Sequence, residues 1–257
     1  MPADALTTDD ALADFARRDI TLLEVVKTVL VAGTGPAVIV MAEMPGISPH
    51  VARFARWVRD AGFTVYMPSL FGRDGALPDA DEGAAIFQRA CMSAEFRAFA
   101  ANESSPVTQW LRALARLAHR ECGGPGVGAI GMCFTGNFAL SMMLEQAVLA
   151  PVLSQPSLPL NDPGGLEIAP QELQIVAERM RREDLTVLAY RFEGDRFCVA
   201  ANSEVPPFFA RHVTTPHSVV TVHLIDEAGQ PTIAARDEIL SFFKARLGSS
   251  GSSAAAC

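Results

Sequence analysis

A cysteine lies where a buried strand is expected to end and a helix to begin, in the run Gly-Met-Cys-Phe-Thr-Gly over residues 131–136. A sharp strand–nucleophile–helix turn raises its central side chain at the carboxyl end of a parallel strand, beside the positive end of the helix dipole. That position favours the thiolate of Cys133, and it places the N–H of Phe134 to donate to an oxyanion. Small residues such as Gly131 and Gly136 are needed because the helix returns close to the strand. The run therefore predicts a cysteine nucleophile for acyl transfer, with a buried core thiol as the alternative.

The remaining cysteines give no sign of a metal site or a redox pair. They are interpreted as two packing residues, one helix-end residue and one tail residue: Cys91, Cys198, Cys122 and Cys257. No Cys-x-x-Cys spacing is present, and no metal-ligand spacing joins the cysteines to the five histidines. We therefore expect free thiols, a reducing compartment and no structural metal such as zinc.

An elbow of this kind is followed along the chain first by an acid and then by a histidine. The acid should stand on the loop after a later strand, and residues 186–192 form such a strand, followed by Glu-Gly-Asp. Asp195 is therefore the first candidate for the acid and Glu193 the second. An aspartate after a glycine is also common as a turn residue or a helix cap, which is the alternative interpretation of Asp195.

Three histidines come late enough in the chain to act as the general base. His217 follows Thr-Thr-Pro in a loop-like segment, and loops carry catalytic groups more often than packed elements do. His223 lies in an alternating run typical of a strand, and His212 ends an expected helix, where a cation suits the dipole. His217 is the preferred base, with His223 and His212 left open. His50 and His119 come too early in the chain.

Short apolar runs alternate with amphipathic stretches along most of the chain. Strands are expected near 37–42, 63–67, 127–130 and 186–190, and helices near 48–61, 106–120, 134–144, 170–182 and 231–247. Continuous apolar strands separated by helices indicate a parallel sheet covered on both faces. The sequence therefore predicts a single doubly wound α/β domain over 1–247 with a mostly parallel sheet. The stretch 248–257, rich in Gly, Ser and Ala, is predicted to be a flexible tail.

The composition restricts the classes of function. The 257 residues carry a formal net charge of −8, with 49% hydrophobic and 19% charged residues. The acidic balance argues against a nucleic-acid-binding surface, and no apolar run reaches the roughly 18 residues that a membrane span needs. The N-terminus has neither the basic region nor the apolar segment of a secretory signal. We expect a cytoplasmic protein with no nucleic-acid and no membrane partner. The run Gly-Thr-Gly-Pro at 33–36 is not interpreted as a phosphate loop, because it precedes its strand and lacks a lysine.

Three segments together resemble the dienelactone hydrolase family, whose members are thiol-dependent α/β-hydrolases. Glu-Met-Pro-Gly-Ile at 43–47 is similar to the family's Glu-x-x-Gly segment, the run 131–136 to its Gly-x-Cys-x-Gly-Gly elbow, and His-Ser-Val at 217–219 to its histidine segment. The likeness covers most of the chain, from about Pro36 to Leu247. It implies an α/β-hydrolase fold, no cofactor, and a small-molecule lactone or ester as substrate. The oligomeric state is left open between a monomer and a homodimer.

The resemblance also implies roles for individual side chains. Cys133 corresponds to the nucleophile, Asp195 to the orienting acid and His217 to the general base. Glu43 corresponds to the glutamate that holds the resting thiol and yields it when substrate arrives. A carboxylate near a thiol raises the pKa of that thiol by like-charge repulsion. The thiol therefore stays protonated and unreactive until the two groups separate.

The oxyanion hole of the family corresponds here to the backbone N–H groups of Met44 and Phe134. The chain departs from the family pattern at Thr135, which replaces the first glycine after the elbow, and at Val219, which replaces an aromatic residue. The interval between Asp195 and His217, 217 − 195 = 22 positions, is also shorter than is usual in the family. Another alignment places Gln230 at the histidine position, which would leave the site without a base and describe a binding protein on a hydrolase scaffold.

Two stretches rich in Gly, Pro, Ser and Asp, 69–105 and 154–169, are expected to be surface excursions that could wall a pocket. Arginines near the pocket hold substrate carboxylates in the family, and Arg73 and Arg97 are candidates here, with a solvated surface role as the alternative. Fold and triad do not choose the substrate, so a cysteine hydrolase of another acyl compound is the alternative activity.

Overall fold

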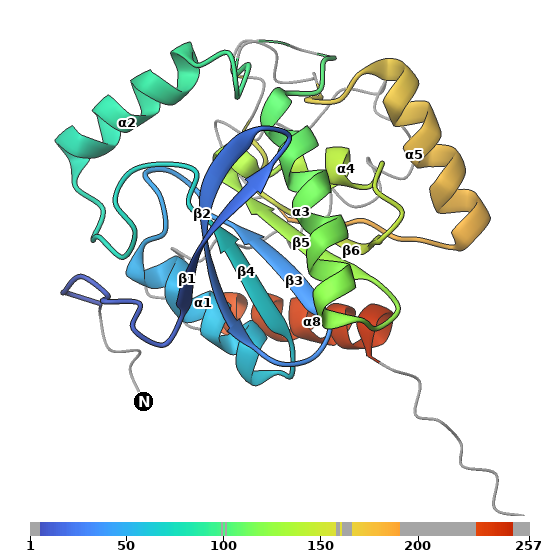
Figure 1. Ribbon diagram of the computed structural model, residues 1–257, viewed down its shortest axis with the longest axis horizontal. Coiled ribbons are helices and arrows are strands. Elements are labelled where there is room, and N and C mark those ends of the chain that lie inside the picture. The colour runs from blue at the N-terminus through green and yellow to red at the C-terminus, as the bar shows by residue number, and fades with distance from the viewer. Residues whose placement is uncertain are drawn as a thin grey trace, which may run out of the picture.

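The computed structural model describes residues 6–98, 100, 102–157, 160, 166–190 and 230–248 (Figure 1). Within them the chain forms a seven-stranded sheet in the order β1-β2-β4-β3-β5-β6-β7. The strands are β1 (Ala16–Leu22), β2 (Val25–Gly33), β3 (Ala37–Met41), β4 (Thr64–Pro68), β5 (Val127–Met132), β6 (Val148–Ser154) and β7 (Leu188–Tyr190). β2 pairs antiparallel with β1 and β4, whereas the strands from β4 through β3, β5 and β6 to β7 pair in parallel. The predicted α/β fold with a mostly parallel sheet is confirmed.

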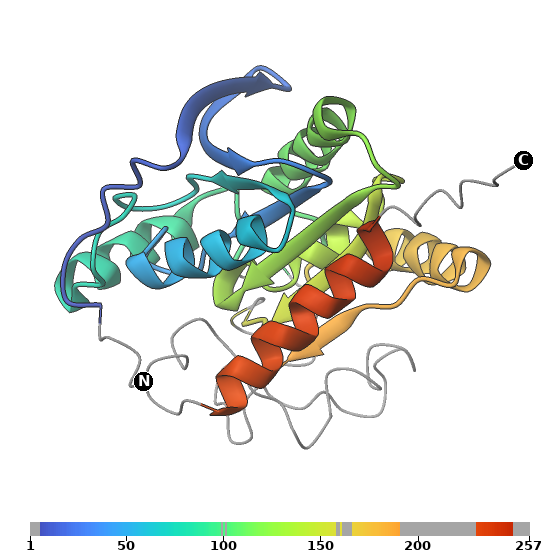
Figure 2. The same cartoon turned by 90° about the horizontal axis from the view of Figure 1, so that it is seen from below.

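Helices cover both faces of this sheet. They are α1 (Pro49–Asp60), α2 (Ala80–Met92), α3 (Pro106–Cys122), α4 (Phe138–Met142), α5 (Pro170–Glu183) and α8 (Gln230–Leu247), with a 3-10 turn, η1 (Cys133–Thr135). α1 and α8 pack on the face to which β3 presents Val38 and Val40, and Figure 2 shows both helices in front of the sheet. α3 and α4 pack on the other face, against Ile39 and Met41. Because successive side chains of β3 enter opposite cores, all five of its residues are buried.

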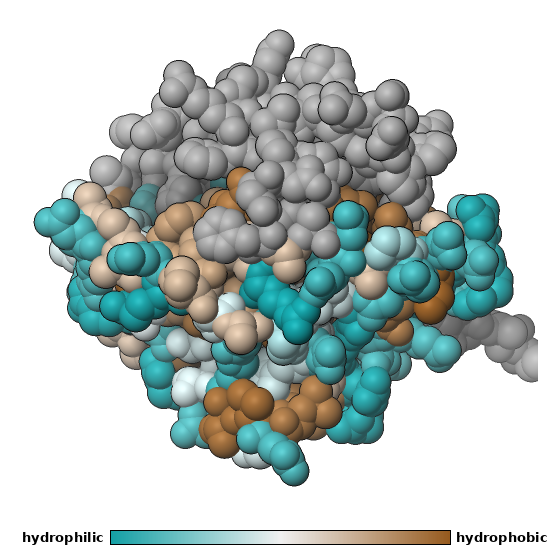
Figure 3. Space-filling model, turned by 90° about the horizontal axis from the view of Figure 1, so that it is seen from above, coloured by the Kyte–Doolittle hydropathy of each residue, from teal (hydrophilic) through white to brown (hydrophobic). Residues whose placement is uncertain are grey.

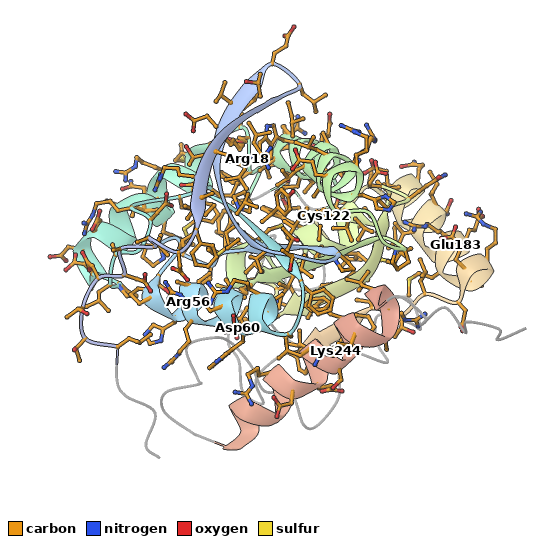
Figure 4. All side chains as sticks on the ribbon, turned by 60° about the horizontal axis from the view of Figure 1, so that its bottom comes forward. Arg18, Arg56, Asp60, Cys122, Glu183 and Lys244 are labelled. Carbon is orange, nitrogen blue, oxygen red and sulfur yellow. The ribbon has the colours of Figure 1, made fainter. Side chains whose placement is uncertain are left out.

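Helix α1 shows how the sequence fixes an element. Its N-cap is Ser48, whose hydroxyl accepts the N–H of Val51 at 3.3 Å. On its polar side Arg56 (Figure 4) reaches the N-terminal segment, with Nη1 at 2.5 Å from a carboxylate oxygen of Asp10 and Nη2 at 2.7 Å from one of Asp14. These pairs hold the segment before β1 against the helix.

Some elements differ from the sequence-based expectation. The helix expected over 134–144 begins instead as η1, and the α-helix proper is α4. The reason is local: the N–H of Gly136 donates to the carbonyl of Cys133 at 2.9 Å, an i→i+3 bond that tightens the turn. The hairpin of β1 and β2, the strand β6 and the helix α2 were not predicted.

Part of the predicted organisation lies outside the described residues. Of the expected tail at 248–257, the structure describes only Gly248, whose N–H donates to the carbonyl of Lys244 at 2.9 Å. Within the ranges that are described, no helix combines the length and apolar character needed to cross a bilayer.

Candidate active site

The cysteine elbow adopts a left-handed backbone conformation. Cys133 follows β5 directly and has a φ of 50°, a region that residues other than glycine rarely occupy. Such strain persists only where the surrounding structure imposes it, and it is typical of a nucleophile turn. Cys133 is partly exposed at this turn. A nucleophile needs such exposure to reach its substrate, whereas a core thiol would be fully buried.

Two glycines make the elbow sterically possible. A Cβ at Gly131 would lie 2.0 Å from the carbonyl oxygen of Thr135, and a Cβ at Gly136 would lie 2.4 Å from Cα of Pro156. Both contacts are with backbone atoms, which cannot yield as the end of a flexible side chain can. Glycine is therefore needed at both positions, as expected from the sharp turn.

Thr135, where the family pattern has glycine, fits into the elbow through hydrogen bonds. Its hydroxyl is fully buried and accepts the N–H of Met132 at 2.9 Å. The same oxygen lies 3.2 Å from the carbonyl oxygens of both Met41 and Ala42, at the end of β3. The threonine therefore joins the elbow to the segment that continues into Glu43.

The structure brings Glu43 and Cys133 to the same edge of the sheet. In the parallel pair of β3 and β5, Met41 lies opposite Gly131, and Glu43 and Cys133 each follow two residues later. Glu43 is only 2% exposed. Met44, one of the two residues predicted to supply oxyanion donors, follows Glu43 and is partly buried against the core. Carboxyl ends of adjacent parallel strands form the usual binding crevice of an open α/β sheet.

The second predicted oxyanion donor, Phe134, is anchored by an aromatic cluster. Its ring is fully buried and meets three other rings edge-on, with centroid distances of 5.5, 6.2 and 5.7 Å to Phe71, Phe87 and Phe96. Edge-to-face pairs contribute about 0.5–1.5 kcal/mol each beyond their burial. The three partners come from the stretch 69–105, which packs against the elbow. These rings were not predicted from the sequence.

A second segment meets the elbow from the end of β6. The N–H of Ser157 donates to the carbonyl of Cys133 at 3.1 Å, and its hydroxyl oxygen lies 3.6 Å from the Cys133 sulfur. Ser157 was not predicted from the sequence. The available signal was the polar run Ser-Gln-Pro-Ser that follows an apolar stretch at 148–153.

The predicted acid and base, Asp195 and His217, lie outside the described residues, as do the alternatives Glu193, His212 and His223. β7 ends beside β6, with Tyr190 opposite Ser154, so the chain enters 191–229 at the edge of the sheet that carries the elbow. Gln230, the residue of the rival alignment, begins α8.

Other candidate residues have separate surroundings. Arg73 pairs with Glu82 at 3.1 Å, and Arg97 pairs with Glu103, all four at the surface. In the part of the chain that the structure describes, no three His, Cys, Asp or Glu side chains gather as metal ligands would.

The sequence itself decides the family. Residues 25–164 match the family model described as "Dienelactone hydrolase family". The chain belongs to the dienelactone hydrolase family. The matched stretch contains Glu43 and the cysteine elbow and ends before Asp195 and His217.

A solved structure supports the α/β-hydrolase fold of this dienelactone hydrolase family member. A dienelactone hydrolase-like promiscuous phosphotriesterase from metagenomic libraries shares 18% identity, covers 92% of this chain and 100% of its own, and has a TM-score of 0.51. Dienelactone hydrolase from Anabaena variabilis shares 14% identity, with 91% and 99% of the two chains covered and a TM-score of 0.47. At 18% identity the likeness to the phosphotriesterase concerns the fold alone. No curated protein matches the sequence.

Proposed function

We propose that this hydrolase cleaves a lactone or a small carboxylic ester through a thioester on Cys133, with Asp195 and His217 completing a triad. The observation that carries the proposal is the left-handed φ of 50° at Cys133, at the end of a central strand in a dienelactone hydrolase family member. Strained backbone of this kind is common at functional sites, and here it stands at the strand–helix turn where a nucleophile belongs. The partly exposed cysteine at that turn supports the assignment.

The first half of the reaction forms the thioester. His217 takes the thiol proton, and the sulfur of Cys133 attacks the carbonyl carbon of the substrate. The oxygen becomes an oxyanion, which accepts hydrogen bonds from the N–H groups of Phe134 and Met44. The C–O bond then breaks, and the leaving alkoxide takes the proton from His217. In a lactone, that alkoxide stays attached to the acyl group.

The second half releases the acid. His217 removes a proton from water, and the hydroxide attacks the thioester carbon through a second tetrahedral oxyanion. The C–S bond breaks, the carboxylic acid leaves, and the proton on His217 returns to the sulfur of Cys133. Asp195 accepts a hydrogen bond from the imidazole and orients it. Between turnovers Glu43 holds the thiol.

The test is the hydrolysis of lactones and p-nitrophenyl esters by Cys133→Ala beside Cys122→Ala, a control at a cysteine that contacts Tyr66 instead. Loss of the nucleophile is expected to lower kcat by about 10³-fold or more, and the control is expected to keep it. Rapid acid quenching should trap an acyl adduct on Cys133 by mass. Full turnover by Cys133→Ala would end the proposal.

The base is assigned in the same assay. His217→Ala is expected to lose turnover, and His223→Ala and His212→Ala are expected to retain it. Loss in His223→Ala alone would move the base to that residue. If only non-ester acyl compounds in the substrate panel turn over, the activity is that of a cysteine hydrolase of another acyl class.

A further inference from the structure

The segment after β6 is built onto the elbow at several points. The N–H of Gln155 donates to the carbonyl of Tyr190 at 2.7 Å, which holds the segment to the end of β7. Pro156 packs so closely on Gly136 that no Cβ fits between them. The N–H of Ser157 then donates to the carbonyl of Cys133 at 3.1 Å. The position of Ser157 relative to the cysteine is therefore fixed by its neighbours and by its own backbone.

The side chain of Ser157 meets the reacting atom. Its hydroxyl oxygen lies 3.6 Å from the Cys133 sulfur, and the residue is only 9% exposed, so water competes little for this contact. A hydroxyl can accept a hydrogen bond from a thiol or donate one to a thiolate. The second is the stronger bond, because hydrogen bonds to an ionised acceptor are about twice as strong as neutral ones.

We propose that Ser157 is a further catalytic residue, whose hydroxyl donates a hydrogen bond to the sulfur of Cys133 and stabilises its thiolate. The inference rests on the proposed function for its role in turnover. It assigns opposite effects to two neighbours of the thiol: Glu43, from the end of β3, disfavours the anion by charge, and Ser157, from the end of β6, favours it. His217 and Asp195 are the other titratable groups that the proposed site brings to this sulfur.

A structural role can be separated from a catalytic one, because two different atoms of Ser157 contact the cysteine. Ser157→Ala keeps the backbone N–H that holds the elbow and removes only the hydroxyl. Ser157→Thr keeps both the backbone N–H and the hydroxyl. Ser93→Ala is the matched control, because it removes a hydroxyl that instead accepts the N–H of Glu95 beyond α2.

The experiment measures the rate at which iodoacetamide alkylates Cys133 as a function of pH, followed by peptide mass. In Ser157→Ala the midpoint of that profile is expected to rise by about one pH unit, a tenfold loss of thiolate below the midpoint. Ser157→Thr and Ser93→Ala are expected to keep the wild-type midpoint. The value of kcat/KM for an ester should fall in Ser157→Ala and return in Ser157→Thr. An unchanged midpoint in Ser157→Ala overturns the proposal.

Alkylation needs no turnover, so the two proposals fail separately. If Cys133→Ala abolishes ester hydrolysis while Ser157→Ala leaves the midpoint in place, the hydrolase stands and the role of Ser157 falls. If the midpoint rises in Ser157→Ala while the wild-type protein hydrolyses no ester or lactone, the hydrogen bond stands and the proposed function falls.

Discussion

Thr135 shows how one side chain can compensate for the loss of a glycine. Its hydroxyl oxygen accepts a hydrogen bond from the N–H of Met132 and lies within 3.2 Å of two carbonyl oxygens at the end of β3. A glycine at this position would provide no side-chain acceptor for the N–H of Met132. The hydroxyl thus links the strand end that carries Glu43 to the turn that carries Cys133.

Removing this hydroxyl without changing the shape of the residue tests the link. Thr135→Val is expected to lower the free energy of unfolding by about 1–3 kcal/mol, because the buried N–H of Met132 loses its acceptor. Urea denaturation measures this loss. Thr135→Ser keeps the hydroxyl and is expected to stay closer to the wild type. Equal stability of Thr135→Val and the wild type would show that the hydroxyl contributes nothing.

Among individual residues, the sequence predicts those whose role depends on the spacing of near neighbours in the chain. The turn around Cys133 could be anticipated, because a strand, two glycines and a cysteine occur within six positions. The polar run that contains Ser157 could be seen, but its contact with the sulfur could not, because that contact depends on β6 lying beside β5, and no local pattern specifies that neighbour. The hydrogen bonds of Thr135 to β3 are likewise a consequence of sheet order.

Elements were predictable where their sequence follows ordinary rules and were missed where it does not. The hairpin of β1 and β2 turns through Leu23 and Glu24, which have φ values of 51° and 63°. Such turns normally use Asn-Gly, so the sequence carries no turn signal there. β6 contains Pro151, and a proline argues against a central strand, yet β6 lies between β5 and β7.

Asn and Gly, the residues that such turns normally use, should stabilise this hairpin turn. Replacing Leu23 by Asn and Glu24 by Gly is expected to raise the free energy of unfolding by about 1 kcal/mol, because positive φ is costly for residues with a branched or long side chain. Thermal unfolding measures the gain. Glu24→Ala retains a Cβ at positive φ and should bring no gain. An unchanged or lower melting temperature in the double variant would contradict this account of the turn.

The same double variant affects the surface of the hairpin. Leu23, Val25 and Val26 are 62%, 45% and 59% exposed. Figure 3 shows a hydrophobic patch at the lower edge of its view. Replacing Leu23 by Asn removes one of these exposed apolar groups, so the variant is not expected to gain stability through burial. Any gain in stability is therefore attributable to the backbone of the turn.

Over the whole molecule, buried and paired carboxyl groups make opposite contributions to the pH dependence of stability. Arg18 holds Glu121 through two hydrogen bonds of 2.7 and 2.8 Å, which lowers the pKa of Glu121 to about 2. Arg56 lowers the pKa of Asp14 in the same way. Their stabilisation is present above the pKa of the unfolded chain and is lost as the pH falls toward the lowered pKa of the folded state.

Glu167, just before α5, acts in the other direction. It is 1% exposed, and burial raises the pKa of its carboxyl well above the ordinary value of 4.5, with the Ser105 hydroxyl offsetting only part of the effect. Well below pH 4.5 the carboxyl is protonated in both the folded and the unfolded chain. As the pH rises, the unfolded chain releases this proton while the folded chain keeps it. The free energy of unfolding therefore falls with a slope of about 1.4 kcal/mol per pH unit, until the raised pKa of the folded state is reached.

Glu167→Gln keeps the size of the side chain and removes this ionisation. The variant is expected to match the wild type at pH values below 4.5 and to exceed its stability by a growing margin as the pH rises above 4.5, as measured by urea denaturation at a series of pH values. Glu178→Gln, on the exposed side of α5, is the control and should show no such divergence. Parallel stability curves for Glu167→Gln and the wild type across this range would mean that Glu167 is ionised in the folded protein.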